Sequence, residues 1–292
     1  MVGDPPPWRG CAERSSARGM AIIPADISPA VIEATLRTRV IARPLEVVAE
    51  IGSTNDAVMG AGRAGRAEGL AILADRQTAG RGRRGRSWAS PAGVGLYTSV
   101  LLRPQLTPAK MPLLTLVAGL GVAEAVEEIA GVATRLKWPN DVLVEGRKVA
   151  GILAEMASVD EQVGHIVIGI GINVNHGPQD LPEELFPAAT SLSLVTGSRI
   201  PRGELAAALY NGLDRWYQIF RQRQIEAILA AGRERSATLG RPVDVLADEE
   251  RWQGLAVDLD ADGALLVREE GGELRRVVAS DVSIRTPAVQ GT

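Results

Sequence analysis

One short segment of the sequence combines glycine and arginine in a way that suits the binding of an anion. The ten residues 79–88 read AGRGRRGRSW and contain three glycines and four arginines. Glycine lets backbone N–H groups come close to a ligand, because no Cβ stands in the way. Each arginine adds a planar, permanently charged set of donors that matches phosphate or carboxylate. We call residues 80–87 the arginine loop, and we predict that it closes over an anion.

Three other interpretations of the arginine loop compete with this one. The spacing of Gly80, Gly82 and Gly85 matches a dinucleotide-binding fingerprint, but that motif opens a helix, whereas residues 90–93 (SPAG) lead into a strand-like segment. Arginine–glycine runs also bind RNA, usually from disordered tails of basic proteins. A solvated surface turn is compatible with the loop taken alone. The choice therefore depends on residues elsewhere in the chain.

The composition is that of an ordinary globular protein. The 292 residues are 46% hydrophobic and carry a net charge of -3, so the chain can bury a sizeable core. Five Trp, three Tyr and two Phe are too few for a platform on which long single strands of nucleic acid could stack. Together with the negative net charge, this predicts no nucleic-acid partner.

Cysteine usage and hydropathy bear on the compartment. The single cysteine, Cys11, excludes an intramolecular disulfide and fits a reducing cytoplasm. The longest apolar stretch, 111–126, contains Gly119, Gly121 and Glu124 and is too short to cross a bilayer, so it predicts a buried helix and no membrane partner. Residues 1–25 are predicted to be a disordered extension without a secretion signal, and either Met1 or Met20 could start translation.

Helices and strands that could position the arginine loop follow from apolar periodicity and capping residues. Ser28 and Pro29 predict a helix start, with a short helix over 31–41. Ser53, Thr54 and Asn55 offer caps for a helix to about residue 64. Further helices are predicted over 108–129, 204–220 and 224–233. Strands are predicted over 45–51, 70–75, 96–103, 134–137, 141–144, 149–156 and 165–174.

The chain changes character at Gly240. Short alternating segments at 243–246, 252–259, 264–267 and 274–278 are separated by acidic and glycine-containing turns. This pattern predicts a small all-β unit of about fifty residues. We therefore predict an α/β (α+β) domain over 26–236 and a β domain over 237–287.

Four further motifs resemble those of the biotin protein ligases. They are RLKWPNDVLV at 135–144, RKVAGILAE at 147–155, GIGINVN at 169–175 and STN at 53–55. They occur in the family's order, over roughly residues 47–285, and agreement among several motifs is far more specific than one match. The resemblance implies a central mixed sheet related to the class II aminoacyl-tRNA synthetases, followed by a small C-terminal SH3-like β-barrel.

The activity implied by the resemblance has two ATP-dependent steps. The carboxylate of biotin attacks the α-phosphorus of MgATP, releasing pyrophosphate and forming biotinyl-5′-AMP. A lysine of a biotin carboxyl carrier domain of an acyl-CoA carboxylase then displaces AMP. The implied small molecules are biotin, ATP and Mg²⁺, although no carboxylate cluster in the sequence identifies protein ligands for the metal.

The first step brings two anions together. Unit charges about 4 Å apart in a partly shielded site repel by roughly 4 kcal/mol, so fixed cations must offset this repulsion. By resemblance and by charge, Lys137, Arg81 and Arg83 hold the carboxylate and the α-phosphate together, and Lys148 reaches the acyl carbonyl or the phosphate. Asp141 is the candidate that orients or deprotonates the acceptor amine.

The resemblance also implies the residues that contact the two ligands. Biotin is expected at Ser53, Thr54, Asn55, Gln77, Gly80, Arg81, Gly82, Arg83, Lys148 and Gly151. ATP or the adenylate is expected at Arg84, Arg86, Trp88, Lys137, Asn140 and Asn173.

Several of these residues have plain structural interpretations. Residues 53–55 could serve simply as a helix cap. Asn140 could belong to a Pro-Asn-Asp turn, and Asn173 could form a strand-terminal turn. Trp88 and Trp138 could serve as packing residues. His165 is predicted to be a partly buried strand residue and His176 a surface residue.

Other function classes remain open at this point. A lipoate or octanoate ligase shares the KVAG element at 148–151 but usually lacks the other motifs. A non-catalytic biotin sensor would not need cations for a triphosphate. The proline-rich residues before Ser53 do not resemble a DNA-reading winged helix, so no repression of transcription is expected. Monomer and homodimer are both compatible with the sequence.

Overall fold

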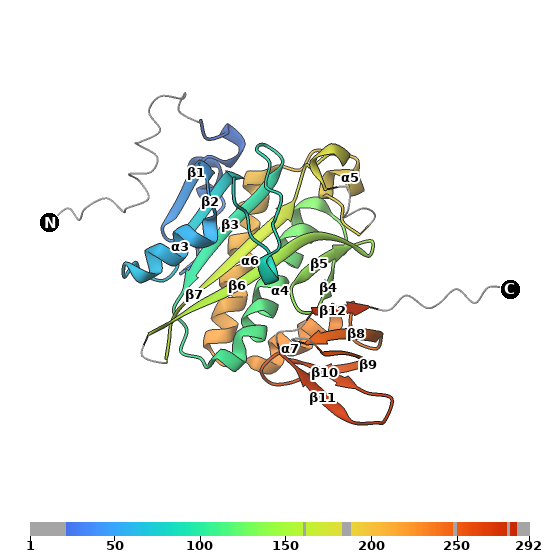
Figure 1. Cartoon of the computed structure of the whole chain (residues 1–292). Coiled ribbons are helices and arrows are strands. Elements are labelled where there is room, and N and C mark those ends of the chain that lie inside the picture. The colour runs from blue at the N-terminus through green and yellow to red at the C-terminus, as the bar shows by residue number, and fades with distance from the viewer. Residues whose placement is uncertain (1–21, 160–161, 183–187, 248–249, 279–280, 285–292) are drawn as a thin grey trace.

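The computed structural model describes residues 22–159, 162–182, 188–247, 250–278 and 281–284. The predicted extension at 1–25 lies mostly outside these residues. Two sheets and their covering helices make up the described chain (Figure 1). The larger sheet has the strand order β1-β2-β3-β7-β6-β5-β4. The pair β1–β2 is parallel and the other neighbours are antiparallel, so the sheet is mixed as predicted.

The strands of the larger sheet follow the predicted segments closely. They are β1 (Leu45–Ile51), β2 (Ala71–Gln77), β3 (Gly95–Leu102), β4 (Arg135–Lys137), β5 (Asp141–Val144), β6 (Arg147–Val159) and β7 (Gln162–Asn173). β3 is buried along its whole length, including the polar residues Thr98 and Ser99. β6 and β7 form the long central hairpin of the sheet.

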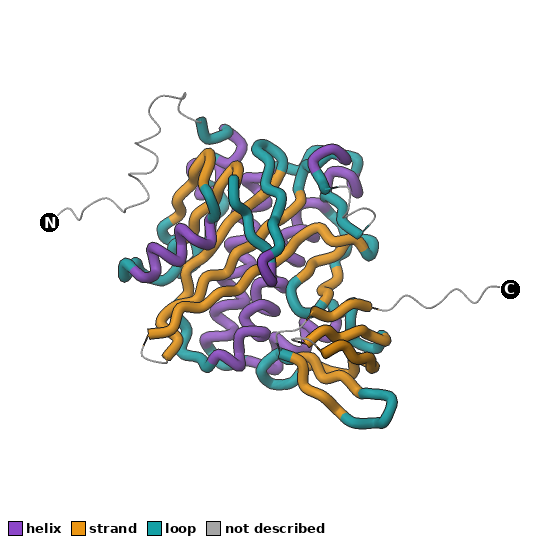
Figure 2. The backbone as a smooth tube through the Cα atoms, viewed as in Figure 1, coloured by secondary structure: helices purple, strands orange, loops and turns teal. Residues whose placement is uncertain are grey.

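Helices cover both faces of this sheet (Figures 1 and 2). One face carries α3 (Thr54–Arg63), and the opposite face carries α4 (Met111–Ala130) and α6 (Arg202–Arg221). α4 is buried over most of its length, so the apolar stretch 111–126 forms a core helix as predicted. α4 and α6 pack closely together at Gly121, where a Cβ would lie 2.9 Å from the backbone N of Leu213. No helix among the described residues is long and apolar enough to span a membrane.

The first predicted helix is wrong in extent. α2 covers only Pro29–Glu33, preceded by the 3-10 turn η1 (Ala25–Ile27), whereas a helix was expected over 31–41. The carboxylate of Asp214 on α6 accepts hydrogen bonds from the backbone N–H groups of Arg39, Val40 and Ile41. These tertiary bonds replace helical ones and hold the segment in turns.

Four further short elements complete the larger unit. They are the 3-10 turns η2 (Arg83–Gly85), which lies in the arginine loop, η3 (Pro108–Lys110) and η4 (Pro178–Asp180), and the helix α5 (Leu192–Thr196), which was not predicted. α7 (Ile225–Glu234) then leads toward the second sheet.

The second sheet is antiparallel, with the order β11-β10-β9-β8-β12. Its strands are β8 (Pro242–Ala247), β9 (Glu250–Leu259), β10 (Leu265–Arg268), β11 (Leu274–Val277) and β12 (Asp281–Ile284), of which β12 was not predicted. The indole Nε1 of Trp138, between β4 and β5, donates to the carbonyl of Gly263, 3.1 Å away. Trp138 thus packs at the junction of the two sheets, as its interpretation as a packing residue predicted.

Candidate active site

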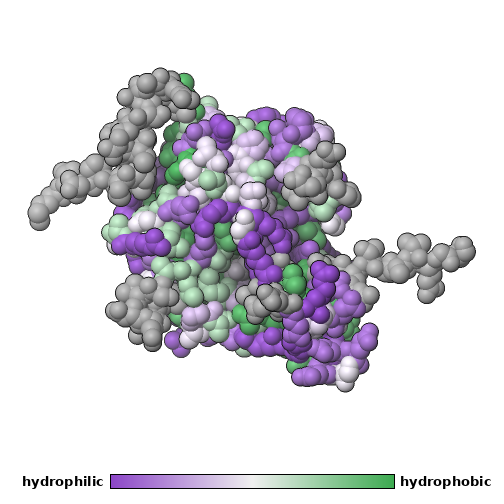
Figure 3. Space-filling view, viewed as in Figure 1, coloured by the Kyte–Doolittle hydropathy of each residue, from purple (hydrophilic) through white to green (hydrophobic). Residues whose placement is uncertain are grey.

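A cavity of about 730 Å³ lies where the arginine loop, the centre of the larger sheet and the start of the second sheet meet. Hydrophilic residues gather over the middle of this face of the molecule and on the second sheet below it (Figure 3). The predicted site residues that line the cavity come from segments spread over residues 53–173. They are Ser53, Thr54, Asn55, Gln77, Arg81, Gly82, Arg83, Arg86, Trp88, Lys137, Asn140, Asp141, Lys148, Gly151 and Asn173.

Two predicted residues, Gly80 and Arg84, do not line the cavity. A Cβ at Gly80 would lie 2.4 Å from the carbonyl oxygen of Trp88, so this glycine permits the close return of the loop. Arg84 adopts the left-handed conformation, with φ 54°, and its Nη2 donates to the carbonyl of Leu246 on β8 at 3.2 Å. Both residues shape the loop, and their ligand contacts stay predictions.

Two glycines on the floor of the cavity make room for the ring of Trp88. Gly151 on β6 and Gly171 on β7 are register partners, and the ring of Trp88 lies against both. A Cβ would come within 2.8 Å of the ring at Gly151 and within 2.5 Å at Gly171. The ammonium of Lys148 lies 5.3 Å from the centroid of the same ring, within cation–π range.

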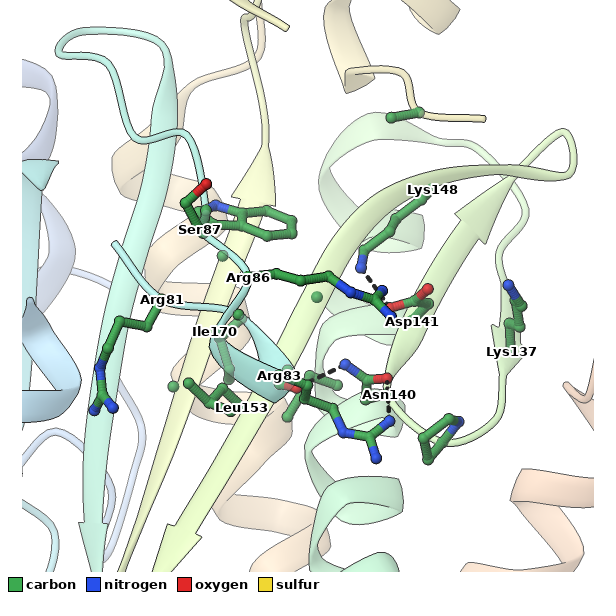
Figure 4. A pocket seen from close by; sticks show the side chains of 18 of the residues that line it. Arg81, Arg83, Arg86, Ser87, Lys137, Asn140, Asp141, Lys148, Leu153 and Ile170 are labelled. Carbon is green, nitrogen blue, oxygen red and sulfur yellow. Dashed lines mark hydrogen bonds and ion pairs between the residues drawn. The ribbon is translucent and has the colours of Figure 1, made fainter. Parts of the chain in front are cut away.

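One end of the cavity is cationic (Figure 4). Lys148 Nζ pairs with Asp141 Oδ1 at 2.6 Å. Arg83 Nη1 donates to Asn140 Oδ1 at 3.3 Å, and Asn140 Nδ2 in turn donates to the carbonyl of Ile152. The first bond ties the turn at 138–141 (WPND) to the arginine loop, and the second holds the turn against β6.

Lys137 lies on β4 beside Asp141, its register partner on β5 (Figure 4). Within the described part of the chain, its ammonium makes no hydrogen bond or ion pair. Across the whole lining, six residues are basic and two are acidic. The cavity therefore favours an anionic ligand.

The other end of the cavity is neutral and built from hydroxyl and amide groups. We call Gln77, Thr54, Ser99 and Asn55 the polar chain. Gln77 Oε1 lies 3.1 Å from Thr54 Oγ1, which lies 2.7 Å from Ser99 Oγ, which lies 2.5 Å from Asn55 Oδ1. Gln77 Oε1 also accepts from the backbone N–H of Thr54, and Gln77 Nε2 donates to Ser90 Oγ.

The polar chain has fewer protons than contacts. Its two ends are amide oxygens, which only accept, and the two hydroxyls between them carry one proton each. Three oxygen–oxygen contacts therefore share two protons. Ser99 has one proton and must donate it to Asn55, so it cannot also donate to Thr54. The 2.7 Å contact between the two hydroxyls lies within the usual O–H···O range and the 3.1 Å contact between Thr54 and Gln77 lies outside it, so we infer that Thr54 donates to Ser99 rather than to Gln77. No proton then lies between Thr54 Oγ1 and Gln77 Oε1, so both oxygens can accept a hydrogen bond from an N–H group of a ligand.

Arg81 lies at the neutral end, where carboxylates hold its guanidinium. Its Nη2 lies 2.7 Å from Asp56 Oδ1 and 2.7 Å from Glu155 Oε2. In Figure 4 this guanidinium points away from Lys148 and Asp141. The structure thus separates Arg81 from Arg83 and Lys137, with which it was grouped from the sequence.

The remaining predicted residues have clear structural partners. Ser53 Oγ accepts from the backbone N–H of Asp56, so residues 53–55 do begin a helix while lining the cavity. Asn173 is buried, and its Nδ2 donates to the carbonyl of Thr190. His165 is a buried strand residue, close to its prediction.

The prediction of His176 as a surface residue is wrong. Its side chain is 0% exposed, and its Nε2 lies 3.1 Å from the hydroxyl of Tyr97, which donates to the carbonyl of Pro91. Burial lowers the pKa of His176 to about 4. The neutral ring therefore donates from Nε2 to Tyr97 and links β3 to the segment after β7.

Sequence reasoning missed Glu155 and Ser99, which lie beside the cavity, and Asp244 and Arg251, which line it. Glu155 carried a signal, because it is a charged residue inside the apolar run 149–156. Ser99 gave no comparable signal within its apolar strand. Asp244 and Arg251 reach the cavity from the second sheet, and only the tertiary structure brings them there. Among the described residues, no group of three or more acidic, histidine or cysteine side chains could hold a metal ion.

Comparison with known proteins identifies the family. Residues 49–173 match the biotin/lipoate A/B protein ligase family, and residues 238–285 match the biotin protein ligase C-terminal domain. The biotin–acetyl-CoA-carboxylase ligase of Mycobacterium tuberculosis is 38% identical over 268 residues, covering 88% of this chain and 96% of that protein. The bifunctional ligase/repressor BirA of Bacillus subtilis is 33% identical over 261 residues, covering 89% and 80%.

Solved structures agree with the sequence matches. The biotin protein ligase from Aquifex aeolicus in complex with biotin and ATP superposes with a TM-score of 0.71 at 32% identity, covering 82% of this chain and 99% of that one. The Leishmania major enzyme in complex with biotinyl-5-AMP superposes with a TM-score of 0.54 at 27% identity, covering 80% and 98%. The motifs, the fold and these matches together show that the chain belongs to the biotin protein ligase family.

Proposed function

We propose that this ligase forms biotinyl-5′-AMP from biotin and MgATP and then transfers biotin to a lysine of a biotin carboxyl carrier domain of an acyl-CoA carboxylase. In the first step, a carboxylate oxygen of biotin bonds to the α-phosphorus as the bond to the pyrophosphate oxygen breaks. In the second step, the lysine nitrogen bonds to the acyl carbon, AMP leaves, and the amine loses a proton. The relatives' names and their bound ligands support this chemistry.

The observation that carries the proposal is the division of one cavity into a neutral end and a cationic end. Thr54 and Gln77 provide acceptors that suit the N–H groups of the ureido ring of biotin. Arg83, Lys148 and Lys137 provide the charge that offsets repulsion between a carboxylate and a triphosphate. A single elongated adenylate would occupy both ends.

The geometry supports the following assignment of roles. We assign biotin's ring to the polar chain, and the carboxylate and α-phosphate to Lys137, Arg83 and Lys148. Asp141 orients Lys148 and is placed to receive a proton from the acceptor amine. Trp88, whose Nε1 is buried without a partner among the described residues, is placed to contact the nucleotide when the loop closes.

Magnesium reaches this site with ATP. Mg²⁺ in nucleotide sites is commonly held by substrate phosphates with one or two carboxylates and water. Asp141 and Asp244 are the two acidic residues of the lining, which fits that limited protein share. The metal would shield the charge of the leaving pyrophosphate.

The domain division and the partners complete the proposal. We assign catalysis to residues 26–236 and assign residues 237–287 to a C-terminal domain that contributes Asp244 and Arg251 to the cavity. The described residues before β1 form only η1 and α2, of three and five residues, so we infer no DNA reading by them. ATP use and the lone cysteine favour the cytoplasm as the place of reaction.

One experiment tests the proposed reaction against its rivals. The purified chain is incubated with MgATP, a biotin carboxyl carrier domain and either biotin or lipoate, and the carrier is weighed by mass spectrometry. A gain of one biotinyl group supports the proposal. A gain only with lipoate would make the chain a lipoate ligase, and binding of biotin without any turnover would make it a sensor.

A further inference from the structure

Glu155 on β6 joins the polar chain to the arginine loop. A single carboxylate oxygen, Oε2, accepts from Asn55 Nδ2 at 2.8 Å and from Arg81 Nη2 at 2.7 Å. The side chain lies beside the cavity rather than in its lining, so Glu155 would not touch biotin. Its influence on the site must pass through Asn55 and Arg81.

The carboxylate determines which way the amide of Asn55 faces. A carboxylate only accepts hydrogen bonds, so it must face the NH₂ group of Asn55. The carbonyl of Leu153, 3.4 Å from Asn55 Nδ2, imposes the same orientation more weakly. Asn55 Oδ1 is therefore turned toward Ser99 Oγ, and Ser99 is compelled to donate.

Packing leaves Asn55 no room to escape this orientation by moving. The side chain is 4% exposed and lies over Gly169, where a Cβ would come within 2.0 Å of Asn55 Oδ1. Only a flip of the amide about its last bond is open to it. Without the carboxylate, a flipped Asn55 would donate to Ser99, Ser99 to Thr54, and Thr54 to Gln77.

We propose that Glu155 is a positioning residue that sets the hydrogen-bond direction of the polar chain, so that Thr54 and Gln77 present acceptors to the N–H groups of biotin. In the reversed chain the proton of Thr54 occupies Gln77 Oε1, and the site loses an acceptor. The inference rests on the proposed binding of the ureido ring at this end of the cavity. It requires an acceptor atom at residue 155 but does not require its charge.

The first test compares three variants. Glu155→Leu removes the acceptor and is expected to raise the KM for biotin about tenfold, the cost of one mispaired buried hydrogen bond, with the KM for ATP unchanged. Glu155→Gln keeps an oxygen that can accept from both Asn55 and Arg81, so its KM for biotin should stay within twofold of wild type. Asp56→Asn is the matched control, because the carboxylate of Asp56 also pairs with Arg81 but is not among the hydrogen-bond partners of the Asn55 amide in the described structure.

The second test asks whether the effect travels through Ser99. Ser99→Ala breaks the polar chain, so adding Glu155→Leu to it should raise the KM for biotin no further. A loss that is additive in the double variant would overturn the proposal, as would an unchanged KM for biotin in a folded Glu155→Leu protein. An equal rise in Asp56→Asn would assign the effect to Arg81 instead and would also overturn it.

These outcomes are separate from failure of the proposed function. KM values are read from pyrophosphate release by wild-type enzyme with biotin and MgATP. If wild type releases none, the proposed reaction fails. If wild type is active and Glu155→Leu has the same KM for biotin as wild type, only the proposed role of Glu155 fails.

Discussion

The ammonium of Lys148 lies 2.6 Å from Oδ1 of Asp141, and both side chains line the cavity next to the ring of Trp88. β5 and β6 are neighbouring strands, so this ion pair fixes Lys148 over the glycine floor. Its position makes Asp141 a group that can hold a cation during adenylation and take a proton during transfer.

Replacing Asp141 separates these two uses. We expect Asp141→Asn to slow transfer of biotin from preformed adenylate by about a hundredfold, because the amide cannot take the amine's proton. Pyrophosphate release should fall much less, because Lys148 remains present. Single-turnover transfer to a carrier domain and pyrophosphate release measure the two steps. Equal losses in both steps would restrict Asp141 to orienting Lys148.

The ammonium of Lys137 makes no hydrogen bond or ion pair in the part of the chain that is described. We expect Lys137→Ala to lower biotin-dependent pyrophosphate release at least a hundredfold, because a fixed charge on the reacting groups is lost. Lys110→Ala, a lysine outside the cavity, is the control and should leave the rate unchanged. Near-normal release by a folded Lys137→Ala enzyme would remove Lys137 from the reaction.

Arg83 joins the arginine loop to Asn140. We expect Arg83→Gly still to form adenylate but to release it at least tenfold faster, because the loop loses its tie to the WPND turn. Release is followed by filtering the enzyme and measuring free adenylate over time. Arg223→Gly, in a turn outside the cavity, should behave as wild type, and equal release by all three proteins would contradict the gating role.

The ring of Trp88 packs directly against the backbone of Gly171. We expect Gly171→Ala to displace the ring, because the new Cβ would lie 2.5 Å from it. The emission of Trp88 should shift to longer wavelength, and adenylate formation should fall about tenfold or more. Gly60→Ala is the control, because it is the same substitution in α3 and the new Cβ would have no tertiary neighbour within 4 Å. It should stabilise the fold by roughly 0.5–1 kcal/mol, since alanine favours a helix more than glycine does. Unchanged emission in Gly171→Ala would refute the predicted displacement.

His176 makes stability depend on pH. Its folded pKa of about 4 lies below its ordinary value of 6.5, so the unfolded chain binds more protons between these values. The stabilisation is complete above about pH 6.5 and is lost as the pH falls toward 4. Urea unfolding should show roughly 2–3 kcal/mol more loss between pH 7 and pH 4.5 in wild type than in His176→Gln, whose amide can still donate to Tyr97.

The matched variant removes other acid effects from this comparison. Asp180 and Arg202 lie near His176, and burial also lowers the pKa of His165, but all three are present in both proteins. Identical slopes for wild type and His176→Gln would show that His176 does not titrate on unfolding in this range.

Local pattern was enough to predict most of the elements. The strand at 45–51, the Ser53 cap and the buried helix after Pro108 follow from apolar period and capping chemistry, which act between near neighbours. The segment 34–41 could not be predicted, because its hydrogen-bond acceptor is Asp214, more than 170 residues away. β12 was missed for a related reason, since it pairs with β8 across the intervening hairpins.

The sequence by itself determined the chemical groups of this ligase: the arginine loop, the lysines of the KWPND and RKVAG motifs, and the polar residues that suit a small neutral ring. Only the tertiary structure decided how those groups are partnered. It clamps Arg81 between Asp56 and Glu155, leaves the ammonium of Lys137 unpaired within the described residues, and buries His176. The physical reason is that residue type sets which bonds a side chain can make, whereas the packing of distant strands sets which of them it makes.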